Sequence, residues 1–308
     1  MTTSIPTMRE LGRQLGNWGR WGPEDERGTT NLITPERVAA AARLVRTGDV
    51  FDLGIPLDQN GPQPGGYRIN PIRLMSETGQ EQVFPGGFKY ADDYVFMPLQ
   101  AGSQYDSLAH VHYDDRLYNG HPVSGLTVKG ADKCGIDTQA RGIAGRGVLL
   151  DIARFRGVDW LESGSAVGPD ELDRVAAAQG VEVGPGDILL IRTGWRARFL
   201  AEHDAASFMA GEPGLGLGCA AWLRERDVAV VGSDNFGVEV MPGENPGAMF
   251  ELHMVLIRDM GMTLAEMLDL EDLAEACATD GVYDFFYTGS PLKFTRGAGS
   301  PINPLAIR

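Results

Sequence analysis

The 308-residue sequence has little of what several large classes of protein require. Its three cysteines, Cys134, Cys219 and Cys277, are odd in number and far apart, and none belongs to a Cys-x-x-Cys pair. This pattern argues against a disulfide framework and against a thiolate zinc site. We expect three reduced cysteines in the core.

Long apolar runs and an excess of positive charge are also lacking. No stretch approaches the roughly 18 apolar residues of a membrane span, and the first residues have no apolar segment of the kind found in signal peptides. Lys and Arg number 27 against 42 for Asp and Glu, and the net charge of −15 repels phosphate backbones and anionic lipids. We therefore expect a cytoplasmic protein that binds neither nucleic acid nor membranes.

Apolar periodicity and turn residues predict strands alternating with helices. Short apolar runs bounded by turn residues are typical of strands and occur at 50–57, 147–152, 187–192 and 227–232. Helical spacing, with caps or glycines at the ends, predicts helices at 35–47, 170–179 and 219–225. No internal repeat or linker divides the chain, so residues 1–308 are expected to form one α/β domain with an N-terminal arm at 1–34.

Two glycine- and proline-rich segments fall outside these elements. The run at 60–66 is a surface loop long enough to cover a site. The tail from Pro291 onward is expected to be irregular but packed, because its apolar residues would otherwise be left in water.

Histidine is scarce, yet three of the five histidines lie within twelve residues, at His110, His112 and His121. Asp106 precedes them. In an extended segment Asp106 and His110 would share one face, and in a helix they would be neighbours at i, i+4. A carboxylate is a hard ligand for Zn²⁺ or Mn²⁺, and an imidazole can bind metal or move protons near neutral pH. A structural network in which Asp106 only orients His110 is equally compatible with composition alone.

The same segment resembles a motif of a known family. The run Gln100-Ala-Gly-Ser-Gln-Tyr-Asp-Ser-Leu-Ala-His has the spacing of His-x-Gly-Thr-His-x-Asp-x-x-x-His, the motif of the cyclase family that includes bacterial kynurenine formamidase and isatin hydrolase. Further segments at 146–151, 186–195, 232–235 and 299–301 look like family landmarks in family order. The resemblance implies a swivelling β/β/α fold, with a mixed β core and flanking helices, assembled as homodimers or homotetramers.

The resemblance also implies roles for individual residues. It assigns Asp106, His253 and Glu266 as metal ligands, and His110, with Asp106, as the catalytic acid/base pair. The two motif histidines are replaced here by Gln100 and Gln104. A neutral amide oxygen is a weak ligand that suits Mn²⁺ better than Zn²⁺, so Mn²⁺ is slightly favoured and one metal ion can remain instead of two. A metal-free protein that keeps the scaffold is the alternative.

Other residues are candidates for substrate binding. Trp18 and Trp21 resemble an N-terminal element that approaches the family's active site, although they fit a core or interface equally well. His112 and His121 are candidates for the pocket wall or for a solvated turn. Asp234 follows an apolar strand and is a candidate for ligand contact or for a turn cap. Candidates for pairing with a substrate carboxylate are Arg73, Arg192 and Arg296.

The implied reaction is hydrolysis of a small amide or lactone, such as an aryl formamide, a cyclic amide or an enol lactone, by a metal-activated water with His110 as general acid/base. Two alternatives remain open. One is a polyketide-type cyclase or dehydratase on the same scaffold, favoured by the loss of the two motif histidines. The other is a binding protein without metal or catalysis.

Overall fold

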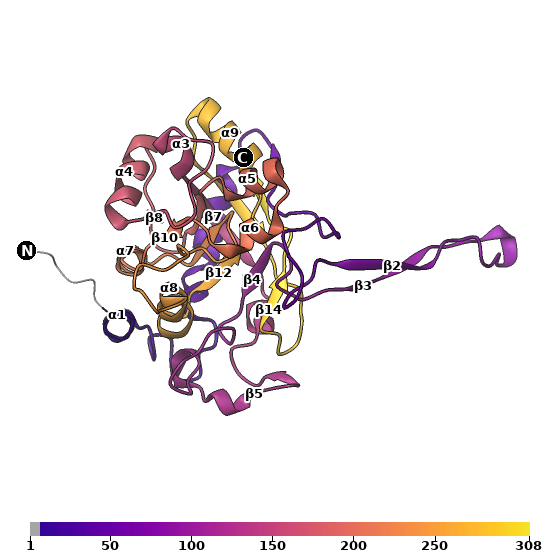
Figure 1. Cartoon of the computed structure of the whole chain (residues 1–308), viewed down its shortest axis with the longest axis horizontal. Coiled ribbons are helices and arrows are strands. Elements are labelled where there is room, and N and C mark those ends of the chain that lie inside the picture. Colours follow the sequence, from indigo (N-terminus) through magenta and orange to yellow (C-terminus); the bar gives the residue numbers. More distant parts are fainter. Residues whose placement is uncertain (1–6) are drawn as a thin grey trace, which may run out of the picture.

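The structure is a computed structural model that describes residues 7–308, so the first six residues of the expected N-terminal arm lie outside it. At its centre is a mixed nine-stranded sheet (Figure 1). Its strands are, in spatial order, β1 (Val50–Asp52), β15 (Leu305–Ile307), β13 (Asp284–Gly289), β7 (Ile143–Asp151), β9 (Ile188–Arg192), β11 (Val230–Ser233), β12 (Thr263–Glu266), β4 (Gln104–Asp106) and β14 (Gly299–Pro301).

The middle of the sheet is parallel and almost entirely buried. Strands β7, β9, β11 and β12 pair in parallel, and the outer pairs are antiparallel. Every residue of β9 and β11 is buried, which explains why their sequences are continuous apolar runs. Strands β7, β9 and β11 confirm three of the predicted strands, with boundaries shifted by a few residues. The fourth predicted strand, at 50–57, ends at Asp52 as β1.

Helices flank the sheet. They are α1 (Met8–Leu15), α2 (Pro35–Ala41), α3 (Ile152–Arg156), α4 (Pro169–Gln179), α5 (Trp195–Glu202), α6 (Ala205–Ala210), α7 (Cys219–Glu225), α8 (Glu251–His253) and α9 (Glu271–Asp280). Helix α2 begins as predicted, with the Thr34 side chain accepting from the Arg37 backbone N–H. It ends at Ala41, where the backbone tightens into a 3₁₀ turn at Ala42–Leu44. Within residues 7–308 no helix is long and apolar enough to cross a membrane.

The core lies on both faces of the sheet. Leu189 and Ile191 pack into one apolar cluster with residues of α4 and α7, while Ile188 and Leu190 pack into the other with residues of α9. This alternation is what a strand covered on both faces requires. The three cysteines are free and buried, as expected. The single α/β arrangement predicted from the sequence is confirmed.

The tail differs from the sequence-based expectation. Residues from Pro291 onward are not irregular throughout, because β14 and β15 occupy positions at or next to the two edges of the large sheet. Strand β14 pairs with β4, placing Gly299 opposite Asp106. Such short strands lack a periodic signal of their own, and their pairing depends on neighbours that are distant in sequence.

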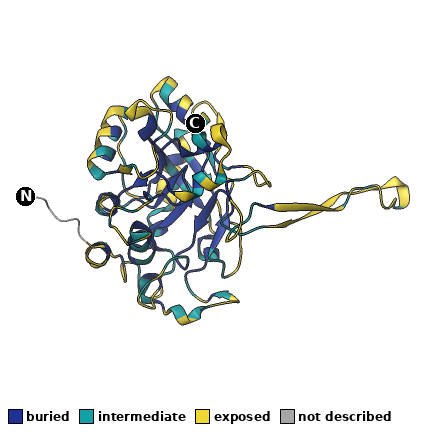
Figure 2. Ribbon diagram, in the orientation of Figure 1, coloured by how far each residue is buried: buried dark blue, intermediate teal, exposed yellow. Residues whose placement is uncertain are grey.

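Small accessory sheets complete the structure. The pairs are β8 (Ala166–Val167) with β10 (Gly214–Leu215), β5 (Leu126–Thr127) with β6 (Gly130–Ala131), and β2 (Ile72–Glu77) with β3 (Asp92–Phe96). The β2–β3 pair extends far from the body of the molecule, as Figure 1 shows. Its residues are exposed along almost the whole length (Figure 2). This hairpin was not predicted from the sequence.

Candidate functional site

The strands β4 and β12 bring two carboxylates together. Gln104 and Asp106 are two residues apart on β4 and therefore point to the same face. Gln104 lies directly opposite Glu266 in the antiparallel β4–β12 ladder, so the Glu266 side chain shares that face. Glu266, 162 residues from Gln104 in sequence, thus adds a carboxylate to the face that carries Gln104 and Asp106.

The third member of the cluster is His253, on α8. Its Nε2 lies 3.1 Å from Glu266 Oε1. Asp106, His253 and Glu266 are all buried, and each offers one possible ligand atom within 4.8 Å of those of the other two. The structure therefore brings together the three residues that the family resemblance assigns to the metal.

Polar atoms within this cluster lack partners. Gln104 Nε2 donates to Glu266 Oε2 and lies 3.4 Å from Asp106 Oδ1. Asp106 Oδ2 and Gln104 Oε1 are buried without a hydrogen-bond partner among the described residues. Two buried oxygens without partners, next to the Glu266 carboxylate, raise the free energy of the folded state unless a cation or a proton binds to them. The residues present therefore fit a divalent metal ion.

The electrostatics of the cluster point the same way. Burial and the neighbouring charge of Glu266 raise the pKa of Asp106 well above its ordinary value. Burial alone would lower the pKa of His253, but its hydrogen bonds and charge interactions with Glu239 and Glu266 outweigh burial and raise that pKa. The raised pKa values favour protons on Asp106 and His253, and a bound cation would compete with those protons.

The Glu239 carboxylate orients His253 from the Nδ1 side of the ring, opposite the Nε2 that faces Glu266. Glu239 Oε2 accepts from the His253 backbone N–H at 2.8 Å and lies 3.1 Å from ring Nδ1. A proton on Nδ1 directed at Glu239 leaves Nε2 free to bind metal, which is the usual arrangement around metal-bound histidines. Sequence reasoning missed Glu239, although an acidic residue between Val238 and Val240 was a signal of a buried charge with a partner.

Glu212 is a second residue that sequence reasoning missed. It is fully buried, and burial raises its pKa well above the ordinary value for a glutamate. Its Oε2 accepts from the Phe236 backbone N–H at 2.6 Å, and its Oε1 has no partner among the described residues. Glu212 thus stiffens the segment between β11 and α8 that carries Phe236 and Glu239.

An open cavity of about 610 Å³ gives access to the cluster. Its wall is formed by residues from six segments of the chain: Gln63, Pro64, Gly65, Tyr67, Arg68, His110, Val111, His112, Met209, Phe236, Met249, Phe250, His253, Met254 and Glu266. The glycine- and proline-rich loop therefore borders the site, consistent with the expected role of that loop. The volume and the mostly apolar wall suit a small organic molecule.

His110 lies between the cavity and the carboxylates. Its Nε2 is 3.7 Å from Asp106 Oδ1, and its side chain keeps 24% of its surface exposed. Burial lowers the pKa of His110 to about 4, so the ring is neutral at pH 7. His112 also lines the cavity. A neutral imidazole next to the candidate metal ligands is suited to accept a proton.

The two motif glutamines are placed differently. Gln104 contacts both carboxylates, as described above. The amide of Gln100 instead lies against Gly299. A Cβ atom added to Gly299 would come within 2.6 Å of Gln100 Nε2. The structure thus gives Gln104, and not Gln100, a polar contact with the cluster.

The tryptophans and His121 lie outside the cavity wall. Trp18 Nε1 donates to the Arg258 backbone oxygen at 2.9 Å, and the Arg258 guanidinium covers the indole. Trp21 stacks with Arg20. His121 is buried, with Nε2 3.3 Å from the Asp25 backbone oxygen. These contacts attach the N-terminal segment to the body. They match the core or interface role that the sequence left open for the tryptophans, and substrate contact by these three side chains stays a prediction.

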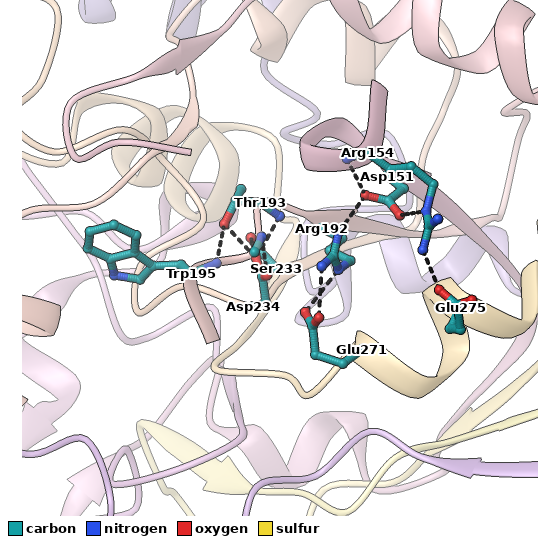
Figure 3. A network of polar contacts seen from close by, with 10 residues as sticks. Asp151, Arg154, Arg192, Thr193, Trp195, Ser233, Asp234, Glu271 and Glu275 are labelled. Atoms are coloured by element: carbon teal, nitrogen blue, oxygen red, sulfur yellow. Dashed lines mark hydrogen bonds and ion pairs between the residues drawn. The ribbon is translucent and has the colours of Figure 1, made fainter. Parts of the chain in front are cut away.

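Asp234 anchors a loop. Its Oδ1 accepts from the backbone N–H and the hydroxyl of Thr193, and its Oδ2 accepts from the Gly194 N–H (Figure 3). The side chain is fully buried and does not line the cavity. Both oxygens are used to hold the turn after β9, so the structure favours the cap over the ligand contact that the sequence left open.

The candidate arginines are also engaged elsewhere. Arg192 bridges Asp151 and Glu271 in the network of Figure 3, Arg73 pairs with Asp93 on β3, and Arg296 pairs with Asp132. Arg68 is the arginine that lines the cavity. No ion pair involves it within residues 7–308, and its charge is felt at both Asp106 and His110. Its position in a Gly/Pro-rich loop gave no signal in the sequence.

Comparisons with known proteins agree with this geometry. A family model described as "Putative cyclase" matches residues 51–240. The isatin hydrolase of Roseibium aggregatum is 29% identical over 153 residues, 46% of this chain and 55% of the relative, so the match spans about half of that protein. A solved structure described as a novel cyclase has a TM-score of 0.90 at 39% identity and covers 96% of this chain and 99% of its own. Isatin hydrolase A from Ralstonia solanacearum shares the fold, with a TM-score of 0.61 at 21% identity over 88% and 95% of the two chains.

Proposed function

Because the chain belongs to the cyclase family, we propose that it is a metal-dependent hydrolase that opens a small amide, cyclic amide or lactone. The observation that carries the proposal is the buried cluster of Asp106, His253 and Glu266, which holds an unpartnered carboxylate oxygen next to a cavity lined by His110. The isatin hydrolase relative supports a hydrolytic reaction on a bond of this class.

The proposed metal ligands are Asp106, His253 and Glu266, with Gln104 Oε1 as a further oxygen donor. Gln100 would need to leave its place against Gly299 to take part. A set with one imidazole and several oxygen donors suits Mn²⁺ or Zn²⁺, and the amide oxygen slightly favours Mn²⁺. When bound, the ion would supply Lewis acidity toward the substrate carbonyl and a water of lowered pKa.

His110 is the proposed proton carrier. Its neutral ring accepts the proton that the attacking water loses and returns it to the leaving nitrogen or oxygen as the C–N or C–O bond breaks. Asp106, 3.7 Å from Nε2, stabilises the imidazolium that exists between these two transfers. The new carboxyl group ionises at neutral pH, so each turnover at an amide of a weakly basic aryl amine or at a lactone releases one proton to solvent.

The cavity wall indicates the shape of the substrate. Phe236, Phe250 and the surrounding methionines offer an apolar surface for a planar ring. Arg68 offers a guanidinium to an anionic substituent on that ring or to the carboxylate that hydrolysis creates. We therefore propose an aryl formamide, a cyclic amide or an enol lactone as the substrate class.

A metal-free cyclase or dehydratase is the second candidate. The observation in its favour is that the Gln104 amide already hydrogen-bonds Glu266, so part of the cluster is satisfied without an ion. In that reaction Asp106 and His110 would do acid/base work on a bound intermediate, and no carboxylate would be formed.

A pH-stat assay separates the two candidates. The metal-loaded protein is offered aryl formamides, cyclic amides and lactones, and hydrolysis is read as proton release matched to product formation. We expect His110→Asn to lower kcat by about 10²–10⁴-fold with metal content unchanged. His203→Asn is the matched control, because His203 is exposed and has a positive φ that Asn tolerates. Product formation without proton release, at equal rates with and without chelator, would overturn the hydrolase proposal.

A further inference from the structure

One part of the cavity wall is a closed loop that carries Arg68. We call residues 63–70 the anchored loop, with Gln63 and Asn70 at its two ends. Within it, Gly65 and Arg68 are partners in an isolated antiparallel β-bridge. Arg68 is therefore presented by a short turn and not by a long unpaired segment.

The side chain of Asn70 closes the anchored loop. Its Oδ1 accepts from the Gln63 backbone N–H at 2.9 Å, and its Nδ2 donates to the Gln63 backbone oxygen at 3.0 Å. Nδ2 also donates to the Gln59 backbone oxygen at 3.3 Å. Gly61 permits this close approach, because a Cβ atom added to Gly61 would come within 2.6 Å of Asn70 Oδ1. One amide side chain thus satisfies both backbone polar groups of Gln63.

The side chain of Gln63 attaches the anchored loop to the strands of the carboxylate cluster. It is only 4% exposed, and its Nε2 donates to the Ala101 backbone oxygen at 3.1 Å and to that of Gln100 at 3.4 Å. Nε2 also lies 3.8 Å from the Met267 sulfur. Residues 100 and 101 lead into β4, and Met267 directly follows β12. The Gln63 amide therefore contacts the segments next to both strands that carry the cluster's carboxylates.

These contacts fix the backbone of Arg68 relative to the cluster. Arg68 lines the cavity, and its positive charge acts on both Asp106 and His110. A loop rich in glycine and proline would otherwise sample many conformations, and an arginine on such a loop would lose that freedom when it binds a ligand. With the backbone already held, only the arginine side chain remains to be ordered.

The exact position of Arg68 matters most for an anionic ligand. No acidic side chain forms an ion pair with Arg68 in the part of the chain that the structure describes, so its guanidinium is available to a bound molecule. A carboxylate can accept two parallel hydrogen bonds from a guanidinium, and this pairing requires a defined orientation of the planar group. A neutral ligand makes no such demand.

We propose that Gln63 and Asn70 are positioning residues, which hold Arg68 at the cavity so that the site selects molecules that carry a carboxylate. Asn70 does not itself line the cavity, so a change at Asn70 can reach a ligand only through the anchored loop. The closure of the loop is independent of the proposed hydrolase activity, whereas the selection of substrates rests on that proposed function.

Fluorine NMR titration tests the proposal without turnover, with para-fluorobenzoate as the probe and para-fluorobenzamide as its neutral counterpart. Asn70→Asp keeps the acceptor for the Gln63 N–H but places a carboxylate oxygen against two backbone oxygens. We expect it to weaken binding of the benzoate about 10-fold and to leave binding of the benzamide unchanged. Asn60→Asp, at an exposed position just before the anchored loop, adds the same charge and is the matched control.

A double-mutant cycle shows whether Asn70 acts through Arg68. Arg68→Met alone should weaken binding of the benzoate by about 10–100-fold, and adding Asn70→Asp to it should then change binding by less than about twofold. Equal effects of Asn70→Asp with and without Arg68, or of Asn70→Asp and Asn60→Asp, would overturn the proposal. So would wild-type protein that binds the benzoate no better than the benzamide. Because the pH-stat assay measures hydrolysis separately, failure of the proposed function would not be mistaken for failure of this inference.

Hydrogen exchange tests the closure of the anchored loop without any ligand. Asn70→Ala removes all three hydrogen bonds of the side chain, so we expect backbone amides within 63–70 to exchange about 10-fold faster, with the central sheet unchanged. Asn60→Ala should exchange like the wild type. Unchanged exchange in Asn70→Ala, or acceleration spread over the whole chain, would refute the role of Asn70 in holding the loop.

Discussion

Glu239→Gln tests how the cluster is organised. The substitution keeps the shape of the side chain and an oxygen that can accept from the His253 backbone N–H, but it removes the negative charge facing ring Nδ1. Removal of such a partner costs about 10–100-fold in metal affinity. Converted at about 1.4 kcal/mol for each tenfold change, the loss is about 1.4–2.8 kcal/mol of binding free energy.

The magnitude follows from the position of Glu239. The residue is only 4% exposed, so solvent cannot replace its charge. One carboxylate oxygen accepts both the backbone and the ring hydrogen bond of His253, which fixes the ring orientation as well as the proton position. Since Gln preserves most of this shape, we expect thermal stability without metal to change far less than metal affinity.

Titration calorimetry with Mn²⁺ on chelator-treated protein is the assay. Glu244→Gln serves as the matched control, because Glu244 accepts from the Leu217 N–H at 2.7 Å and belongs to no part of the cluster. The control should bind Mn²⁺ like the wild type. Mn²⁺ affinity within twofold of wild type in Glu239→Gln, or an equal loss in the control, would refute this account of His253.

Three further predictions address other parts of the structure. Arg192→Met should lower the free energy of unfolding by about 3–5 kcal/mol in urea titration, because it removes the buried arginine that pairs with both Asp151 and Glu271 and leaves the buried Asp151 with only the half-exposed Arg154. A loss below about 1 kcal/mol would contradict this. Arg68→Met should raise KM for substrates that carry a carboxylate and leave KM for neutral analogues unchanged. The control Arg73→Met should change KM for neither kind of substrate. Equal effects of Arg68→Met on both kinds of substrate would refute the role of Arg68. Mn²⁺ binding should release protons and weaken as pH falls, because the raised pKa values of Asp106 and His253 mean that both must give up protons to bind metal. Calorimetry in two buffers of different ionisation enthalpy measures this proton release. Binding without proton release would contradict the prediction.

The centre of the fold was predictable from local sequence, and its edges were not. Strands β9 and β11 are buried on both faces, so their sequences are continuous apolar runs that can be recognised without knowing what they pair with. Strand β14, in contrast, is a Gly-Ser-Pro segment whose extended form depends on pairing with β4. The β2–β3 hairpin was not predicted, because its alternation marks a face that the single chain leaves uncovered.

The site divides in a similar way. Asp106 and His110 lie four residues apart, so their proximity followed from either backbone conformation, whereas the convergence of His253 and Glu266 on them came from the family resemblance and was not derivable from spacing. Glu239 reaches the cluster through a loop between β11 and α8 that has no regular pattern. Trp18 was assigned to substrate by resemblance, but in the structure its indole lies under Arg258.

The central claim is that Asp106, His253 and Glu266 hold a divalent metal ion. Inductively coupled plasma mass spectrometry on protein purified without a metal-affinity step, beside the isosteric Asp106→Asn variant, tests it most directly. We predict about one Mn or Zn ion per chain in the wild type, because the three residues form one set of ligands. The variant should have lost this ion. Absence of metal from both proteins, even after incubation with Mn²⁺ and Zn²⁺, would contradict the claim and favour the metal-free cyclase or dehydratase.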